Sequence, residues 1–161
     1  QNMTDQLSAF STVIKHNPDS KHVKLFYDQW KHERLVVDKW FSTQVLTAHP
    51  DSLNKVVKNL TTHPDFTIKT PNRVRSVLGA FSANTAGFHL ETGENYKLFC
   101  DWILKVDPVN PQVGARMCSA FETWKRYDPK RQQLIKLQIN RVLGTGSVSK
   151  DTREMLTRLI S

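Results

Sequence analysis

The pair His32-Glu33 is the part of this sequence closest to a metal-dependent hydrolytic site. A zinc peptidase motif, His-Glu-x-x-His on a helix, places two imidazoles on one face with a glutamate base between them. Here Val36 stands where the second histidine belongs. His16 and His22 are six residues apart across a proline, so they do not share a helix face. The isolated histidines His49, His63 and His89 are each more typical of a turn or a surface than of a ligand. We therefore expect no metal-binding residue in this chain.

Motifs for nucleophilic or phosphate chemistry are also missing. The sequence contains no Gly-x-Ser-x-Gly elbow, no P-loop and no dinucleotide-binding Gly-x-Gly-x-x-Gly. The two cysteines, Cys100 and Cys118, lie in apolar stretches with no histidine close in sequence. One disulfide is possible from their number, but we interpret both as reduced, buried thiols, which are typical of cytoplasmic proteins. We expect no catalytic residue here and a cytoplasmic location.

Three arginines near expected helix starts are the strongest candidates for a binding role. Pro71 and Pro111 suit the first turn of a helix, where proline's fixed φ fits and no amide donor is needed. Arg73 and Arg75 lie about 100° to either side of the first helix's apolar stripe. Arg116 flanks the stripe of the second helix in the same way. Each could cover the core edge or pair with a carboxylate; alternatively, a guanidinium at a helix start could bind a peptide carboxylate.

Helical spacing of apolar residues runs along almost the whole chain. One stripe at i, i+3, i+4 and i+7 consists of Val23, Phe26, Tyr27 and Trp30. Strand-like alternation is nearly absent, and prolines, glycines and capping residues divide the pattern. Expected N-caps are Thr70, Asn110 and Ser149. The pattern predicts about nine helices, near residues 4–16, 19–33, 35–48, 51–61, 71–83, 95–106, 111–127, 129–143 and 150–160.

Short helices joined by tight turns favour antiparallel pairs. A pair here takes about 30–40 residues, which is the period of helical solenoids. We therefore predict an all-α fold: a curved two-layer superhelix of antiparallel helix pairs, similar to HEAT or armadillo repeats, in a single domain over residues 1–161. A compact bundle is the alternative. Segment 83–94, with Gly87 and Gly93, is expected to be the one long loop.

The chain is basic, with a net charge of +8 and a pI near 9.7. Such a balance is found in nucleic-acid-binding proteins. Here the charge is spread along the chain and not gathered into one arm, so we interpret it as solvated helix faces and expect no nucleic-acid partner. No apolar run approaches the length needed to cross a bilayer, so we expect no membrane partner.

Several sequence strings occur together in the order found in a known family. They are Asp38-Lys39-Trp40-Phe41, the run from Pro71 to Phe81, Phe88-His89, Asn110-Pro111-Gln112-Val113, and Lys125-Arg126-Tyr127-Asp128 followed by Lys130-Arg131-Gln132. Through them the chain resembles the C-terminal helical domain of bacterial-type aminopeptidase N, a family of zinc metallopeptidases with alanyl aminopeptidase activity. The resemblance covers essentially the whole chain. It implies that residues 1–161 are a C-terminal fragment of a larger multidomain enzyme, which also suits the absence of Met at position 1.

The resemblance carries further expectations. The parent enzyme would remove N-terminal residues from peptides, using one zinc ion in a separate catalytic domain, and this chain itself would hold no cofactor. The helical domain would cap the active site and form the substrate chamber and access channel, with the catalytic domain and peptide substrates as its partners. Matched positions place Arg75 and Arg116 on the chamber lining, with Arg73 as a neighbouring candidate. A free-standing basic helical-repeat module that binds a protein or nucleic acid is the alternative function.

Overall fold

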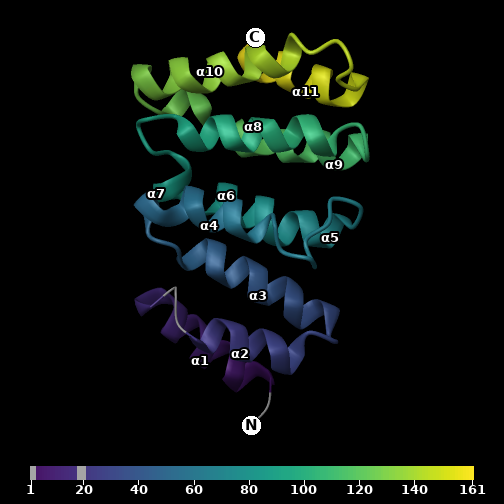
Figure 1. Cartoon of the computed structure of the whole chain (residues 1–161). Coiled ribbons are helices and arrows are strands. Elements are labelled where there is room, and N and C mark those ends of the chain that lie inside the picture. Colours follow the sequence, from purple (N-terminus) through teal and green to yellow (C-terminus); the bar gives the residue numbers. More distant parts are fainter. Residues whose placement is uncertain (1–2, 18–20) are drawn as a thin grey trace.

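Helices and turns make up the chain in our computed structural model, which describes residues 3–17 and 21–161 and contains no strand in those ranges. Figure 1 shows the helices stacked one above another, with the two ends of the chain at opposite ends of the stack. In chain order the elements are α1 (Met3–His16), α2 (Lys21–Trp30), α3 (Arg34–Thr47), η1 (Pro50–Ser52), α4 (Leu53–Leu60), α5 (Pro71–Val74), η2 (Arg75–Gly79), α6 (Ala80–Ala83), α7 (Thr85–Phe88), α8 (Glu94–Val106), α9 (Pro111–Met117), η3 (Cys118–Phe121), η4 (Trp124–Arg126), α10 (Pro129–Leu143) and α11 (Lys150–Ile160).

Neighbouring helices form antiparallel pairs, and each pair packs on the next (Figure 1). Helix α8 contacts α9 within one pair, and α10 contacts α11 within the following pair. Between these pairs, α8 packs against α10 and α9 against α11, which produces two layers. Helix α3 joins the N-terminal pair to the run formed by α5, η2 and α6. The predicted all-α superhelix of stacked helix pairs is confirmed.

Aromatic rings fill the centre of the stack. The Phe88 ring lies 5.4 Å from that of Phe81, 5.5 Å from Tyr96 and 5.2 Å from Phe99, measured between ring centroids, with edge-to-face geometry. Phe121 of η3 contacts the same cluster. All five side chains are at most 1% exposed. Because large rings bury more area than any other side chain, this cluster holds α6, α7, α8 and η3 together.

Two predicted helices have a different geometry in the structure. The predicted helix 71–83 is interrupted by the π-helical turn η2, where the amide of Ala80 donates to the carbonyl of Arg75, five residues earlier. The predicted helix 111–127 is α-helical only as far as Met117, and then tightens into the 3₁₀ turns η3 and η4. The 3₁₀ turns leave both Phe121 and Trp124 buried, and the Trp124 indole Nε1 donates to the Leu159 carbonyl at 2.8 Å.

The predicted loop 83–94 contains helix α7. Asn84 caps this helix, accepting from the Gly87 amide at 3.3 Å, and its amide nitrogen also donates to the Val45 and Ala48 carbonyls. The longest non-helical segment in the described part of the chain is instead 61–70.

Two of the three expected caps are confirmed by their hydrogen bonds. The Asn110 side chain accepts from the Val113 amide and that of Ser149 from the Thr152 amide. Thr70 occupies the N-cap position of α5, but its side chain makes no capping bond. Positions 19 and 20 of the predicted helix 19–33 lie outside the described residues, and α2 ends at Trp30.

Candidate functional site

A pocket of about 390 Å³ lies between the α5–α6 run and helix α9. Its walls are largely apolar, and two arginines, one from each wall, line it. The lining residues are Pro71, Val74, Arg75, Gly79, Ser82 and Ala83 from the first wall, Val113, Arg116, Met117, Ser119 and Ala120 from the second, and Phe99 of α8. The structure therefore brings together Arg75 and Arg116, which are far apart in the sequence.

Both of these arginines keep donors available for an anion. Arg75 is exposed, and its Nη1 donates to Asn72 Oδ1 at 3.3 Å, a long hydrogen bond. Arg116 is also exposed, and its side chain makes no hydrogen bond or ion pair with the residues that the structure describes. No aspartate or glutamate lines the pocket. Because a guanidinium carries five N–H donors in a planar fork, the pair can bind a carboxylate or another oxyanion.

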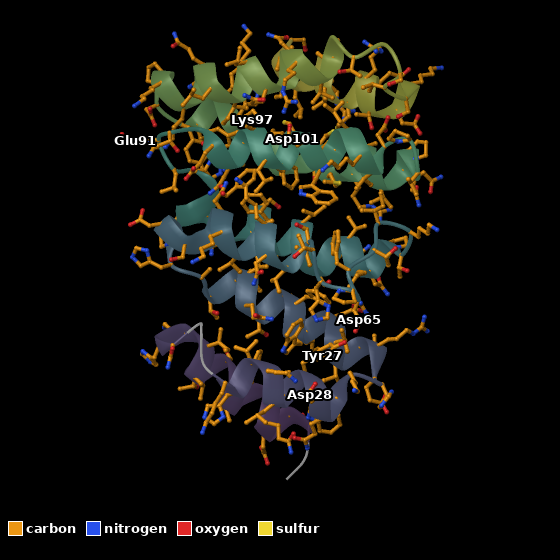
Figure 2. All side chains as sticks on the ribbon, viewed as in Figure 1. Tyr27, Asp28, Asp65, Glu91, Lys97 and Asp101 are labelled. Atoms are coloured by element: carbon orange, nitrogen blue, oxygen red, sulfur yellow. The ribbon has the colours of Figure 1, made fainter. Side chains whose placement is uncertain are left out.

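Arg73 is placed differently, outside the lining of this pocket. Its Nε donates to Asp38 Oδ1 at 2.6 Å, and the two side chains are only 11% and 18% exposed. Its Nη1 donates to the backbone carbonyl of Asp65, and its guanidinium lies 5.2 Å from the centre of the Phe41 ring. Figure 2 shows the Asp65 side chain near Tyr27, whose hydroxyl donates to Asp65 Oδ2 at 2.5 Å. Arg73 thus fastens segment 61–70 to α3.

A second hollow lies on the other side of Arg75. It has a volume of about 520 Å³, and it lies between α3 and the α5–α6 run. Leu35 and Leu46, which are 72% and 49% exposed, stand on its α3 side. Three residues line both hollows: Arg75, Gly79 and Ala83. The Arg75 side chain therefore forms part of the wall between them.

The comparisons with known proteins agree with this architecture. A family model described as "Domain of unknown function (DUF3458_C) ARM repeats" matches residues 1–161. The chain belongs to this family. Over 99% of its length the DUF3458_C domain is 35% identical to aminopeptidase N of Caulobacter vibrioides and 33% identical to aminopeptidase N of Escherichia coli, covering 19% of each of those proteins. The matched part is their C-terminal region.

A solved structure is similar to the domain as well. The crystal structure of Legionella pneumophila aminopeptidase A in complex with aspartic acid matches it with a TM-score of 0.92 and 33% identity. The match covers 99% of the DUF3458_C domain and 19% of that chain. The domain thus spans about a fifth of the length of the relatives it matches.

In the described part of the chain, the DUF3458_C domain has no three His, Cys, Asp or Glu side chains grouped so that they could hold a metal ion. Both cysteines are buried. Burial raises the pKa of Cys118 to about 12 and that of Cys100 further above its usual range, so both thiols stay protonated and are poor nucleophiles at neutral pH.

One histidine is buried although it lies in a turn. His89, expected in a turn or at the surface, follows α7 in a turn, and it is only 9% exposed. Its Nδ1 lies 2.7 Å from the Tyr96 hydroxyl, and its ring stacks on Tyr127 at 3.9 Å between centroids. Burial, with a contribution from the nearby Arg131, lowers the pKa of His89 to about 4.

Two of the three candidate arginines, Arg75 and Arg116, line this pocket, but the sequence did not indicate the residues around them. Gly79, Met117 and the Leu35–Leu46 side of the second hollow were not identified as site residues. A signal existed for one of them, since Gly79 follows Arg75 by four residues inside a helical pattern.

None of the helices in the described ranges is long and apolar enough to cross a membrane.

Proposed function

We propose that this DUF3458_C domain is the non-catalytic C-terminal domain of a zinc-dependent aminopeptidase, which removes N-terminal residues from peptides. In this proposal the zinc ion and the catalytic residues lie in another domain of the same polypeptide. The helical domain caps that active site and forms the substrate chamber and its access channel. Identities of 33–35% to the C-terminal region of aminopeptidase N, across nearly the whole chain, support this assignment.

We assign the contact with substrate to the pocket between the α5–α6 run and α9. The observation that carries the assignment is the presence of two exposed arginines, Arg75 and Arg116, in one pocket without an acidic residue. They would attract the C-terminal carboxylate or an acidic side chain of a peptide, while the apolar walls contact the rest of its end. Arg73, paired with Asp38, keeps the first wall in place.

Peptide substrates and the catalytic domain of the same polypeptide are therefore the proposed partners. We propose a cytoplasmic location, which the two buried cysteines with protonated thiols support. We propose no nucleic-acid or membrane partner.

Replacing the two arginines in the full-length enzyme tests the assignment. We expect Arg75→Ala and Arg116→Ala each to raise KM for peptides by roughly tenfold to a hundredfold, since a hydrogen bond to a charged group contributes about 1.5–3 kcal/mol. The KM for a small alanine chromogenic amide, which has no carboxylate, should stay unchanged. Arg126→Ala is the matched control, because Arg126 is also exposed and lies in η4, outside the pocket.

Equal changes for peptides and for the small amide would remove the carboxylate role. Retention of the domain on nucleic acid that falls steeply with salt concentration would favour the free-standing basic module instead, because phosphate contacts release counterions.

A further inference from the structure

We infer that Gly79 is a positioning residue for Arg75: the space left by its missing side chain holds the Arg75 stem on the wall of the pocket shared with Arg116. This inference rests on the proposed function, because it concerns the same pocket. It adds a residue of the pocket wall whose effect on carboxylate binding passes through the Arg75 side chain.

The π-helical turn brings these two residues close together. In η2 the Ala80 amide bonds to the carbonyl of Arg75, five residues back, so the turn is wider than an α-helical turn. A Cβ added at Gly79 would lie 3.1 Å from Arg75 Cγ and 3.8 Å from Arg75 Cβ. The first distance is shorter than an ordinary van der Waals contact. A side chain at position 79 therefore requires the Arg75 stem to shift by a few tenths of an ångström.

The atom that a side chain at position 79 would displace is Arg75 Cγ, which lies close to the backbone. Cγ is joined directly to Cβ, so a small rotation about the Cα–Cβ bond supplies this shift and displaces the guanidinium at the far end by more than it displaces Cγ. The stem lies on the wall between two hollows, because Arg75, Gly79 and Ala83 line both of them. A change at Gly79 therefore alters the fraction of time for which the Arg75 guanidinium lies in the pocket with Arg116 and not in the apolar hollow beside α3.

Backbone conformation does not explain the glycine. Gly79 has φ −65° and ψ −43°, values that every residue adopts in a helix. A glycine inside a helix costs about 0.5–1 kcal/mol relative to alanine. Alanine would therefore be favoured at this position if only helix stability mattered. The short distance to Arg75 Cγ is the reason that this inference gives for the glycine.

The test uses the full-length enzyme and one peptide in two forms, with a free C-terminal carboxylate and with a C-terminal amide. We expect Gly79→Ala to raise KM for the free acid about threefold to tenfold and to leave kcat and the KM for the amide unchanged. The double variant Gly79→Ala/Arg75→Ala should behave like Arg75→Ala alone, because Gly79 acts through that side chain. Gly146→Ala is the matched control, since a Cβ there meets nothing within 4 Å.

Each outcome has a separate meaning. If Arg75→Ala raises KM for the free acid and Gly79→Ala does not, the positioning role is overturned while the proposed function stands. If neither Arg75→Ala nor Arg116→Ala distinguishes acid from amide, the proposed carboxylate site itself fails. Equal effects of Gly79→Ala on both peptides, or effects that add to those of Arg75→Ala, would show a general structural role and overturn the inference.

A thermal unfolding measurement covers the case in which Gly79→Ala folds poorly. Arg75→Ala removes Cγ, the atom that a Cβ at position 79 would meet most closely. The double variant should therefore recover the melting temperature lost by Gly79→Ala. Failure to recover it would also overturn the inference, because the defect would then arise from something other than the Arg75 stem.

Discussion

His89 is held in its neutral form by its surroundings. Its ring is packed between Tyr96 and Tyr127, and its backbone carbonyl accepts a hydrogen bond of 2.6 Å from Arg131 Nε. Protonation would place a positive charge in the core beside a guanidinium, and so the pKa is lowered to about 4. Burial lowers the pKa of His63 as well.

This difference in pKa predicts a loss of stability in acid. Between pH about 6.5 and about 4, the unfolded chain binds a proton at His89 that the folded chain does not bind, so the free energy of unfolding falls as the pH falls. Below about 4 both states are protonated and this group adds no further loss. We expect a loss of about 1–3 kcal/mol from this residue. Urea unfolding at pH 7 and pH 4.5 measures it.

Variants separate this residue from the rest of the acid response. His89→Gln should be less stable than the wild type at pH 7 but should lose less on acidification. His49→Gln, at a side chain that is 71% exposed, should retain the full acid loss. An unchanged pH dependence in His89→Gln would contradict the assignment.

Arg73 and Arg75 show what a sequence can and cannot predict about a site. Helical spacing placed both beside the same apolar stripe, and the three candidates that it gave with Arg116 include both charged residues of the pocket. It could not distinguish them, because the partner that binds Arg73, Asp38, lies on another helix 35 residues away. Only the tertiary packing decides which arginine is paired and which remains available.

At the scale of elements, Asp107 joins the end of α8 to the start of α11. It is 1% exposed and accepts hydrogen bonds from the Ser149 amide at 2.7 Å, from Ser149 Oγ at 2.6 Å and from Thr152 Oγ1 at 2.6 Å. Gly114 lets α9 approach the same residue, since a Cβ there would lie 2.9 Å from Asp107 Cα. Asp107 thus bonds the end of α8 to the start of α11, and α9 packs closely against it.

We predict that Asp107→Asn lowers the free energy of unfolding by about 2–4 kcal/mol, because an amide can accept fewer of these bonds and leaves buried donors unpaired. Chemical denaturation of the purified chain measures the change. The control is Asp101→Asn in the same helix, where a partly exposed carboxylate pairs with Arg141 and Lys97 and should contribute no more than about 1 kcal/mol (Figure 2). A similar loss in both variants would contradict the role given to Asp107.

Most helices could be predicted because apolar spacing and proline positions are local properties. Helices α8, α10 and α11 begin and end within a residue of the predicted ranges. Sequence could not predict the π turn at Arg75–Gly79 or the 3₁₀ turns after Met117. Their apolar spacing resembles that of an α-helix, and their geometry is set by packing against neighbouring elements. Helix α7 was missed because the capping role of Asn84 was not recognised.

At the scale of the whole molecule, the proposed function assigns the chemistry to another domain and gives this stack of helix pairs the role of a surface. Under that proposal, we predict that the purified 161-residue chain, with zinc added, does not hydrolyse an alanine chromogenic amide, whereas the full-length protein does. A continuous absorbance assay on both proteins measures this. Zinc-dependent turnover by the chain alone would contradict the proposal and require a metal site among its own histidines.

The linear order of the helix pairs has a consequence for how the domain acquires its structure. Each pair contacts mainly the pairs next to it in sequence. Most contacts therefore join residues that are close in sequence, and forming them costs little chain entropy. Assembly can then begin at the aromatic cluster around Phe88 and spread toward both ends, as in other repeat proteins. The domain should consequently fold fast for its size, and its first and last helices should be the earliest to open.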